Sequence, residues 1–150
     1  MSDDTKKYRN AINEGAENVN RDDLGTVAAK ADEILELIGR VDVLKKFAAR
    51  AALLIRLISD YYNNAYTEVP WKTIAMAVFA LLYVLNPVDL IPDYIPVIGF
   101  VDDAAVMGLA WMAIESDVKA YSVWKCGQRD VSYRIKELAE EAFPEMNCGA

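Results

Sequence analysis

Histidine is absent from this sequence of 150 residues. Without imidazole, the chain cannot form a Ser-His-Asp or Cys-His catalytic site or a zinc site with histidine ligands, and it lacks the usual general base for neutral pH. Any reaction would depend on carboxylate, lysine or tyrosine groups. We therefore predict no catalytic residue, and the composition favours a protein that is not an enzyme.

Cysteine occurs only twice, at Cys126 and Cys148. The two positions lack the C-x-x-C spacing of redox and zinc motifs, and Cys148 lies near the end of the chain, where order is usually lowest. Cytosolic proteins keep such thiols reduced. We therefore predict a pair of reduced thiols rather than a disulfide.

No apolar run is long enough for a comfortable membrane span. The run from Ile74 to Leu85 has 12 residues, whereas a span needs about 20, and residues 104–114 are also too few. The charged N-terminus has no apolar segment behind it and does not resemble a secretory signal. We predict a cytoplasmic protein that could lie peripherally on the inner face of the membrane. A hairpin that dips into one leaflet stays open as an alternative.

Basic residues are outnumbered and unevenly distributed. With 16 basic and 23 acidic residues the net charge is −7, which disfavours nucleic-acid binding. Residues 70–114 contain only one basic and four acidic residues. This middle third is therefore expected to be either the buried centre of the fold or the part that meets a membrane or a partner.

The apolar residues recur at helical spacing, and no alternating strand pattern is long enough to build a sheet. We predict helices over residues 24–39, 41–63, 70–85, 100–124 and 135–143, with a weaker one in the first twenty residues. The fold class is all-α: a single-domain bundle of five or six helices with a central apolar helical hairpin joined by a proline/aspartate elbow. Within one cooperative domain, residues 1–69 are amphipathic helices packing on the core, residues 70–126 the hairpin, and residues 127–150 a C-terminal helix and tail.

The elbow sets three prolines and four aspartates inside an apolar segment. Each proline disfavours helix at the residue before it, and aspartates can cap helices or close turns. In that interpretation the carboxylates are structural. In the competing interpretation the chain reversal brings carboxylate oxygens together, as ligands of Mg²⁺ or Ca²⁺. The candidate ligands are Asp89, Asp93, Asp102 and Asp103.

The elbow also carries a long motif. The pattern Pro-x-Asp-Leu-Ile-Pro-Asp-x-Ile-Pro-x-x-Gly-x-x-Asp-Asp occurs without a gap from Pro87 to Asp103. It resembles the signature of the YkvA-like family, a bacterial domain of unknown function, and the likeness extends from about Tyr61 to Tyr121. The resemblance implies a small, helical, membrane-associated domain without an established activity. It marks as signature residues Pro87, Asp89, Pro92, Asp93, Pro96, Gly99, Asp102 and Asp103.

Our leading functional interpretation is a non-enzymatic helical interaction module. It would dock on a membrane surface or a protein partner through the apolar hairpin, with Trp71, Val106 and Trp111 at the interface. No cofactor is expected unless the aspartates bind Mg²⁺ or Ca²⁺, a site that could be hydrolytic. A small regulator or immunity-type protein is a further alternative, and the oligomeric state stays open.

Overall fold

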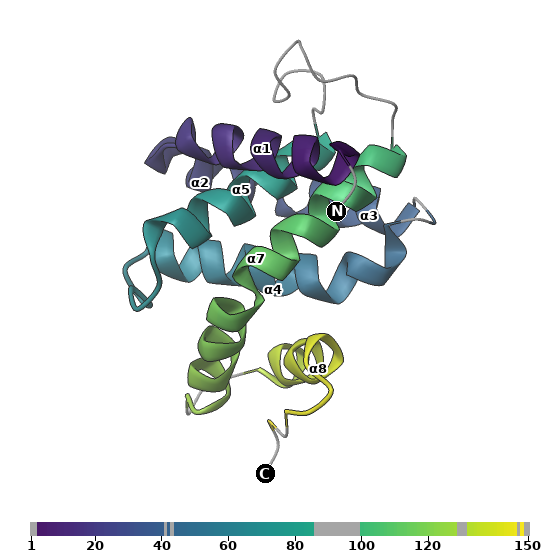
Figure 1. Ribbon diagram of the computed structural model, residues 1–150. Helices are drawn as coiled ribbons and strands as arrows, with labels where there is room; N and C mark the ends of the chain where they lie inside the picture. Colours follow the sequence, from purple (N-terminus) through teal and green to yellow (C-terminus); the bar gives the residue numbers. More distant parts are fainter. Residues whose placement is uncertain are drawn as a thin grey trace.

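The structure is a computed structural model that describes residues 3–40, 42, 44–85, 100–128, 132–146 and 148. All regular structure in these ranges is helical, which confirms the all-α prediction (Figure 1). The predicted count of five or six is too low, because the described residues form seven α-helices and one 3₁₀ helix. They are α1 (Asp3–Glu17), α2 (Arg21–Ala29), α3 (Ala31–Arg40), η1 (Lys45–Phe47), α4 (Ala48–Tyr62), α5 (Trp71–Leu85), α7 (Phe100–Cys126) and α8 (Tyr133–Ala142).

The additional helix arises because the segment predicted as one helix over 24–39 is two. Lys30 leaves the helical backbone at φ −104° and ψ 16°, although no glycine or proline adjoins it. Both α2 and α3 pack on α4 and α5, and the bend between them lets Val27 and Ile34 both be fully buried. Tertiary packing, rather than a local breaker, therefore sets this boundary.

The start of α2 is set locally. The Asn20 side chain accepts a hydrogen bond from the backbone N–H of Asp23 at 3.2 Å, and the Asp23 carboxylate accepts one from the N–H of Asn20 at 2.9 Å. This capping box satisfies two amides at the helix start. It begins α2 at Arg21, earlier than the apolar stripe that starts at Leu24.

The α5 helix lies inside the bundle. Eleven of its 15 residues are buried, and it contacts α1, α2, α3, α4 and α7. A helix that is apolar on all sides is stable only when it is covered all round. The α7 helix crosses α5 and continues beyond it, where α8 packs against its far half (Figure 1). The two helices of the predicted central hairpin therefore contact each other, and the segment that joins them, residues 86–99, lies outside the described residues.

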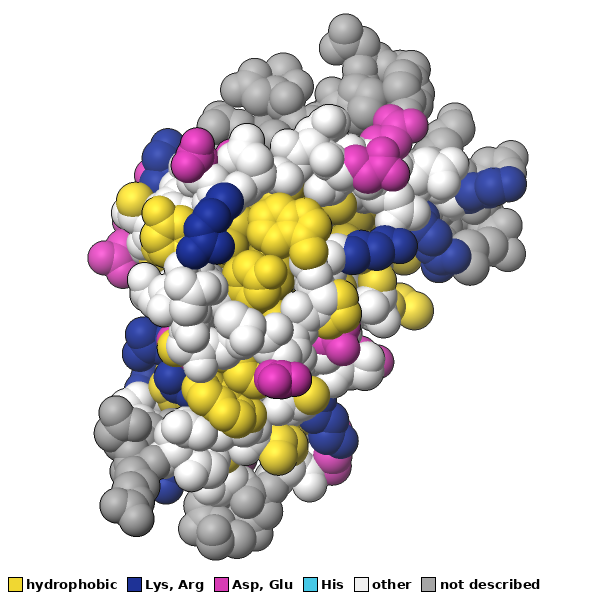
Figure 2. All heavy atoms as spheres, turned by 90° about the vertical axis from the view of Figure 1, so that its left-hand side faces the viewer, with side chains coloured by type: hydrophobic (Ala, Val, Ile, Leu, Met, Phe, Trp, Pro, Cys, Tyr) yellow, Lys and Arg dark blue, Asp and Glu magenta, His cyan; other side chains and the backbone are white. Residues whose placement is uncertain are grey.

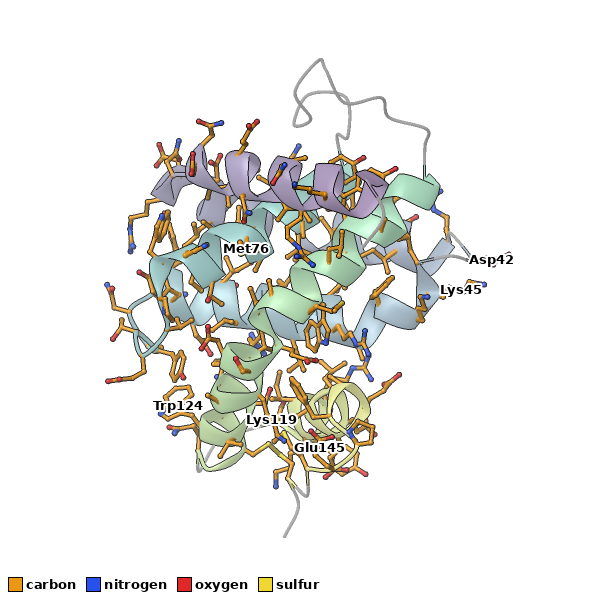
Figure 3. All side chains as sticks on the ribbon, in the orientation of Figure 1. Asp42, Lys45, Met76, Lys119, Trp124 and Glu145 are labelled. Atoms are coloured by element: carbon orange, nitrogen blue, oxygen red, sulfur yellow. A yellow bond between two sulfur atoms is a disulfide. The ribbon has the colours of Figure 1, made fainter. Side chains whose placement is uncertain are left out.

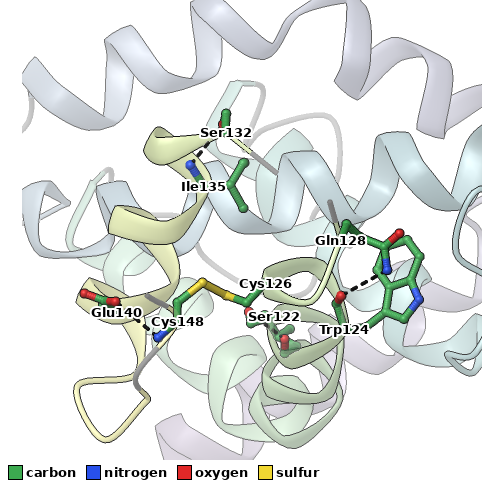
Figure 4. The surroundings of a disulfide bond; sticks show 9 residues. Ser122, Trp124, Cys126, Gln128, Ser132, Ile135, Glu140 and Cys148 are labelled. Atoms are coloured by element: carbon green, nitrogen blue, oxygen red, sulfur yellow. Dashed lines mark hydrogen bonds between the residues drawn. A yellow bond between two sulfur atoms is a disulfide. The ribbon is translucent and has the colours of Figure 1, made fainter. Parts of the chain in front are cut away.

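The prediction of reduced cysteines is wrong, because Cys126 and Cys148 form a disulfide (Figure 4). The α8 helix turns the chain back towards α7, and Phe143 at its end stacks on Trp111 with ring centroids 5.5 Å apart. Glu145 then pairs with Lys119 at 2.8 Å (Figure 3). Cys148 is thereby held near the end of α7, with its Cα 5.4 Å from that of Cys126, a usual separation for a disulfide.

The α1 helix lies close against the core at Gly15. A Cβ atom built there would overlap the ring of Phe79 on α5, which is buried. We expect Gly15→Ala to lower the free energy of unfolding by about 1–3 kcal/mol, because overpacking forces neighbours out of place. The exposed Gly39 in α3 has nothing within 4 Å of such a Cβ, so Gly39→Ala should raise stability by about 0.5–1 kcal/mol. Urea unfolding measures both, and equal effects of the two substitutions would contradict the close packing of α1.

Candidate functional site

The elbow residues proposed as a cation site are placed only in part. Asp102 and Asp103 lie in the first turn of α7, as expected, although their side chains lie outside the described residues. The described residues also do not include Pro87, Asp89, Pro92, Asp93, Pro96 and Gly99. In the part of the chain that the structure describes, no three Cys, Asp or Glu side chains could together hold a metal ion. The cation site stays a prediction, and a Mg²⁺ titration of the melting temperature of the wild type against Asp93→Asn would decide it.

The three residues predicted at an interface occupy different environments. Val106 and Trp111 are buried on α7. The Trp111 ring lies between the Arg50 guanidinium, 5.0 Å from its centroid, and the ring of Phe143. Trp71 is the surface residue of the three, with 39% of its area exposed. A surface available for docking must therefore be built around Trp71.

Trp71 belongs to a cluster at the end of the bundle where α5 begins and α4 ends. The rings of Tyr61 and Trp71 lie 6.1 Å apart, and Tyr62, the next residue in the chain after Tyr61, is exposed. The Arg21 guanidinium lies 5.0 Å from the Tyr62 ring centroid and donates a hydrogen bond to the Tyr62 carbonyl at 2.6 Å. Lys72 is exposed beside Trp71. We call the surface formed by Arg21, Tyr61, Tyr62, Trp71 and Lys72 the aromatic end.

The aromatic end is a mixed surface. Figure 2 views the molecule from the left-hand side of Figure 1, where α5 begins. Apolar side chains gather near the middle of this face, with basic side chains on either side of them. Aromatic rings with polar tips beside lysine and arginine are the combination enriched at membrane–water interfaces.

The start of α5 fixes the position of Trp71. Pro70 precedes the helix, and its carbonyl accepts hydrogen bonds from the backbone N–H groups of Thr73 and Ile74. The hydroxyl of Thr73 donates to the Asp117 carboxylate on α7 at 2.6 Å. Trp71 is therefore the first residue of a helix whose first turn is tied to a neighbouring helix.

Tyr61 and Tyr62 lie at the end of α4, where Asp60 forms several hydrogen bonds. The Asp60 carbonyl accepts hydrogen bonds from the N–H groups of Ala65 and Tyr66 as the chain reverses. The Asp60 carboxylate accepts one from the Tyr121 hydroxyl at 2.6 Å and pairs with Lys125 at 2.9 Å. Burial, and then the hydrogen bond to Asp60, raise the pKa of Tyr121 well above its usual value. The neutral Tyr121 side chain on α7 is thus hydrogen-bonded to the end of α4.

Arg21, Tyr61 and Tyr62 were not predicted as site residues. One signal was available: adjacent helical residues point about 100° apart, so two consecutive tyrosines at the end of an amphipathic helix cannot both face the core. No sequence pattern places Arg21 over Tyr62, because the two are 41 positions apart.

No described helix has both the length and the apolar character needed to cross a membrane. The hairpin prediction can still be compared with known proteins. A family model described as "Protein of unknown function (DUF1232)" matches residues 73–109. This region holds most of α5, the residues between the two helices and the first ten residues of α7.

One curated relative has the printed name "Uncharacterized membrane protein YkvA" and comes from Bacillus subtilis (strain 168). The chain is 36% identical to it over 81 residues, which make up 54% of this chain and 76% of the relative. No solved structure matches the chain significantly. Since the relative is 36% identical and the match covers 76% of its length, the chain belongs to the YkvA-like family.

Proposed function

We propose that the protein is a non-enzymatic helical module that docks on the surface of a membrane through its aromatic end. The observation that carries this proposal is the exposure of Trp71, whose ring lies 6.1 Å from that of Tyr61, at the end of the bundle that also carries Tyr62, Arg21 and Lys72. A relative in the same family carries the name of a membrane protein. Docking at the interface suits a chain whose described helices include none that could span.

The charge of the chain sets the mode of docking. A net charge of −7 repels anionic membranes at long range, but salt screens this repulsion beyond about 8 Å at physiological ionic strength. At contact, Lys72 and the ring-bound Arg21 can meet lipid phosphates while Trp71 inserts among the headgroups. We therefore expect docking to depend on the aromatic side chains first and on the two cations second.

Vesicle flotation tests the role of Trp71. We expect Trp71→Ala to weaken binding to vesicles of phosphatidylethanolamine and phosphatidylglycerol by about tenfold, because aromatic anchors typically contribute more than 1 kcal/mol. The matched control is Tyr133→Ala, since Tyr133 on α8 is also an exposed aromatic residue but lies outside the aromatic end. Equal binding of the wild type and Trp71→Ala, or equal loss in both variants, would contradict the proposal.

The other interpretations stay predictions. A protein partner for the same surface would leave vesicle binding absent. The cation site depends on elbow side chains outside the described residues, and a regulator or immunity-type role has no contact among the described residues that favours it. The absence of nucleic-acid binding, the oligomeric state and the location inside the cell are likewise expectations that the docking proposal does not require.

A further inference from the structure

A second surface, separate from the aromatic end, is a hollow of about 670 Å³ between α1, η1, α4 and α7. Small-molecule sites usually fall in the range of about 300–1,000 Å³. The floor is apolar and is formed by Phe47, Leu109 and Trp111. We call this surface the α7 hollow.

The apolar wall of the α7 hollow is open to solvent. Met112 lines it with 68% of its area exposed, next to the buried Trp111. A large, flexible apolar side chain left in water loses the hydrophobic contribution that burial would give. An apolar ligand chain lying along Met112 and Leu109 would recover that contribution.

Two cations stand at the rim of the same hollow. The Arg50 guanidinium lies 5.0 Å from the ring centroid of Trp111 and 5.8 Å from that of Phe47, and the Lys46 ammonium lies 5.3 Å from that of Phe47. Neither cation forms an ion pair with any carboxylate among the described residues. The neighbouring Lys45, by contrast, pairs with Asp42 at 3.1 Å (Figure 3). In a chain with more acidic than basic residues, two adjacent cations held on aromatic faces form a favourable site for an anion.

Glu115 also lines the hollow, and it is exposed on α7. Its carboxylate disfavours an anionic head placed next to it, whereas Lys46 and Arg50 favour one.

Gly108 keeps the hollow open. A Cβ built on it would meet only the edge of the Phe47 ring, at an ordinary 3.9 Å. Glycine inside a helix costs about 0.5–1 kcal/mol relative to alanine, and packing against the described neighbours does not demand it here. A side chain longer than alanine would instead extend into the hollow.

We propose that the α7 hollow binds a fatty acid, with its carboxylate at Lys46 and Arg50 and its chain along Leu109 and Met112. A guanidinium can donate two parallel hydrogen bonds to a carboxylate, which favours this head group at Arg50. The apolar wall favours a ligand that carries a hydrocarbon chain over a small inorganic anion. This site is independent of the aromatic end and needs no membrane.

Calorimetric titration of the full chain with laurate, below the concentration at which laurate forms micelles, tests the site. We expect laurate to bind, and dodecyltrimethylammonium, which has the same chain length with a cationic head, to bind at least about tenfold more weakly. Equal binding of the two amphiphiles, or no binding of laurate, would overturn the proposal.

Variants locate the binding. Lys46→Gln should weaken laurate binding about tenfold, whereas Lys45→Gln, next to it and paired with Asp42, should leave it unchanged. Gly108→Leu should abolish binding by filling the hollow, and Gly39→Leu on the exposed face of α3 is its control. Equal losses in Lys46→Gln and Lys45→Gln would overturn the assignment even if Gly108→Leu failed to fold. Trp71→Ala should bind laurate normally, which separates this site from the proposed docking surface.

Discussion

Replacing Asp60 with alanine is expected to lower the free energy of unfolding by about 3–5 kcal/mol. The Asp60 carboxylate accepts a hydrogen bond from the fully buried Tyr121 and pairs with Lys125, and the side chains of Asp60 and Lys125 are only 15% and 20% exposed. Alanine would leave a buried hydroxyl and a mostly buried ammonium without this partner. The hydroxyl and the ammonium would still be removed from water, but the interaction with Asp60 that offsets this cost would be gone.

Asp42→Ala is the matched control, because Asp42 pairs with Lys45 at a similar distance while 93% of its side chain is exposed. Exposed pairs contribute about 0–1 kcal/mol, so its loss should be small. Asp60→Asn should cost less than Asp60→Ala, since the amide oxygen can still accept from Tyr121. Urea unfolding of the three variants decides the point, and similar losses for Asp60→Ala and Asp42→Ala would contradict it.

Tyr121 adds a dependence on pH to the same network. Its pKa is raised in the folded protein, mainly by burial, whereas in the unfolded chain a tyrosine titrates near pH 10. Above that pH the unfolded chain releases a proton that the folded protein keeps, so the unfolded state gains stability. The contribution of Tyr121 to the free energy of unfolding is therefore fully present below about pH 10 and is lost as the pH rises above that value.

Much of the fold could be predicted because its signals are local. Pro70 marks the start of α5 and the apolar character of residues 74–85 predicts its burial on all sides. The boundary at Lys30 was missed because nothing in the adjacent residues signals it, and the packing of α2 and α3 on two other helices decides it. The start of α2 differs from the prediction for another reason: the capping residues Asn20 and Asp23 precede the apolar stripe, so hydrophobic periodicity alone does not show that the helix begins at Arg21.

The candidate sites were predicted less completely. Trp71 was predicted at an interface because it is an aromatic residue of a charge-depleted segment, and that role stays a prediction, but the sequence alone did not show which faces of α7 would be covered. Apolar residues are spread around α7, so the packing of α1, α4, α5 and α8 places Val106 and Trp111 inside and leaves Met112 exposed. The sequence does not single out Arg50 and Lys46: Arg50 lies over the ring of Trp111, which is far from it in the chain, and Lys46 over that of its neighbour Phe47.

The second large effect is expected from the disulfide, whose loss should lower the free energy of unfolding by about 3 kcal/mol. Cys126 and Cys148 are 22 positions apart, and a cross-link over such a loop restricts the unfolded chain. The stacking of Phe143 on Trp111 and the burial of Ile135, Leu138 and Ala139 should keep α8 folded on α4 and α7. We therefore expect a lower melting temperature on reduction, with little change in helix content before melting.

Comparison of the wild type with the double variant Cys126→Ser, Cys148→Ser separates the cross-link from other effects of a reductant. Dithiothreitol should lower the stability of the wild type to that of the variant and leave the variant unchanged. Thiol titration of the unfolded, unreduced wild type should find no free thiol. Two free thiols in protein prepared from a cell would instead support the predicted cytoplasmic location, because reducing compartments keep cysteine pairs in the thiol form. That result would also show that the disulfide does not contribute to stability in the cell. The same titration thus connects the stability of the C-terminal helix to the compartment in which the protein works.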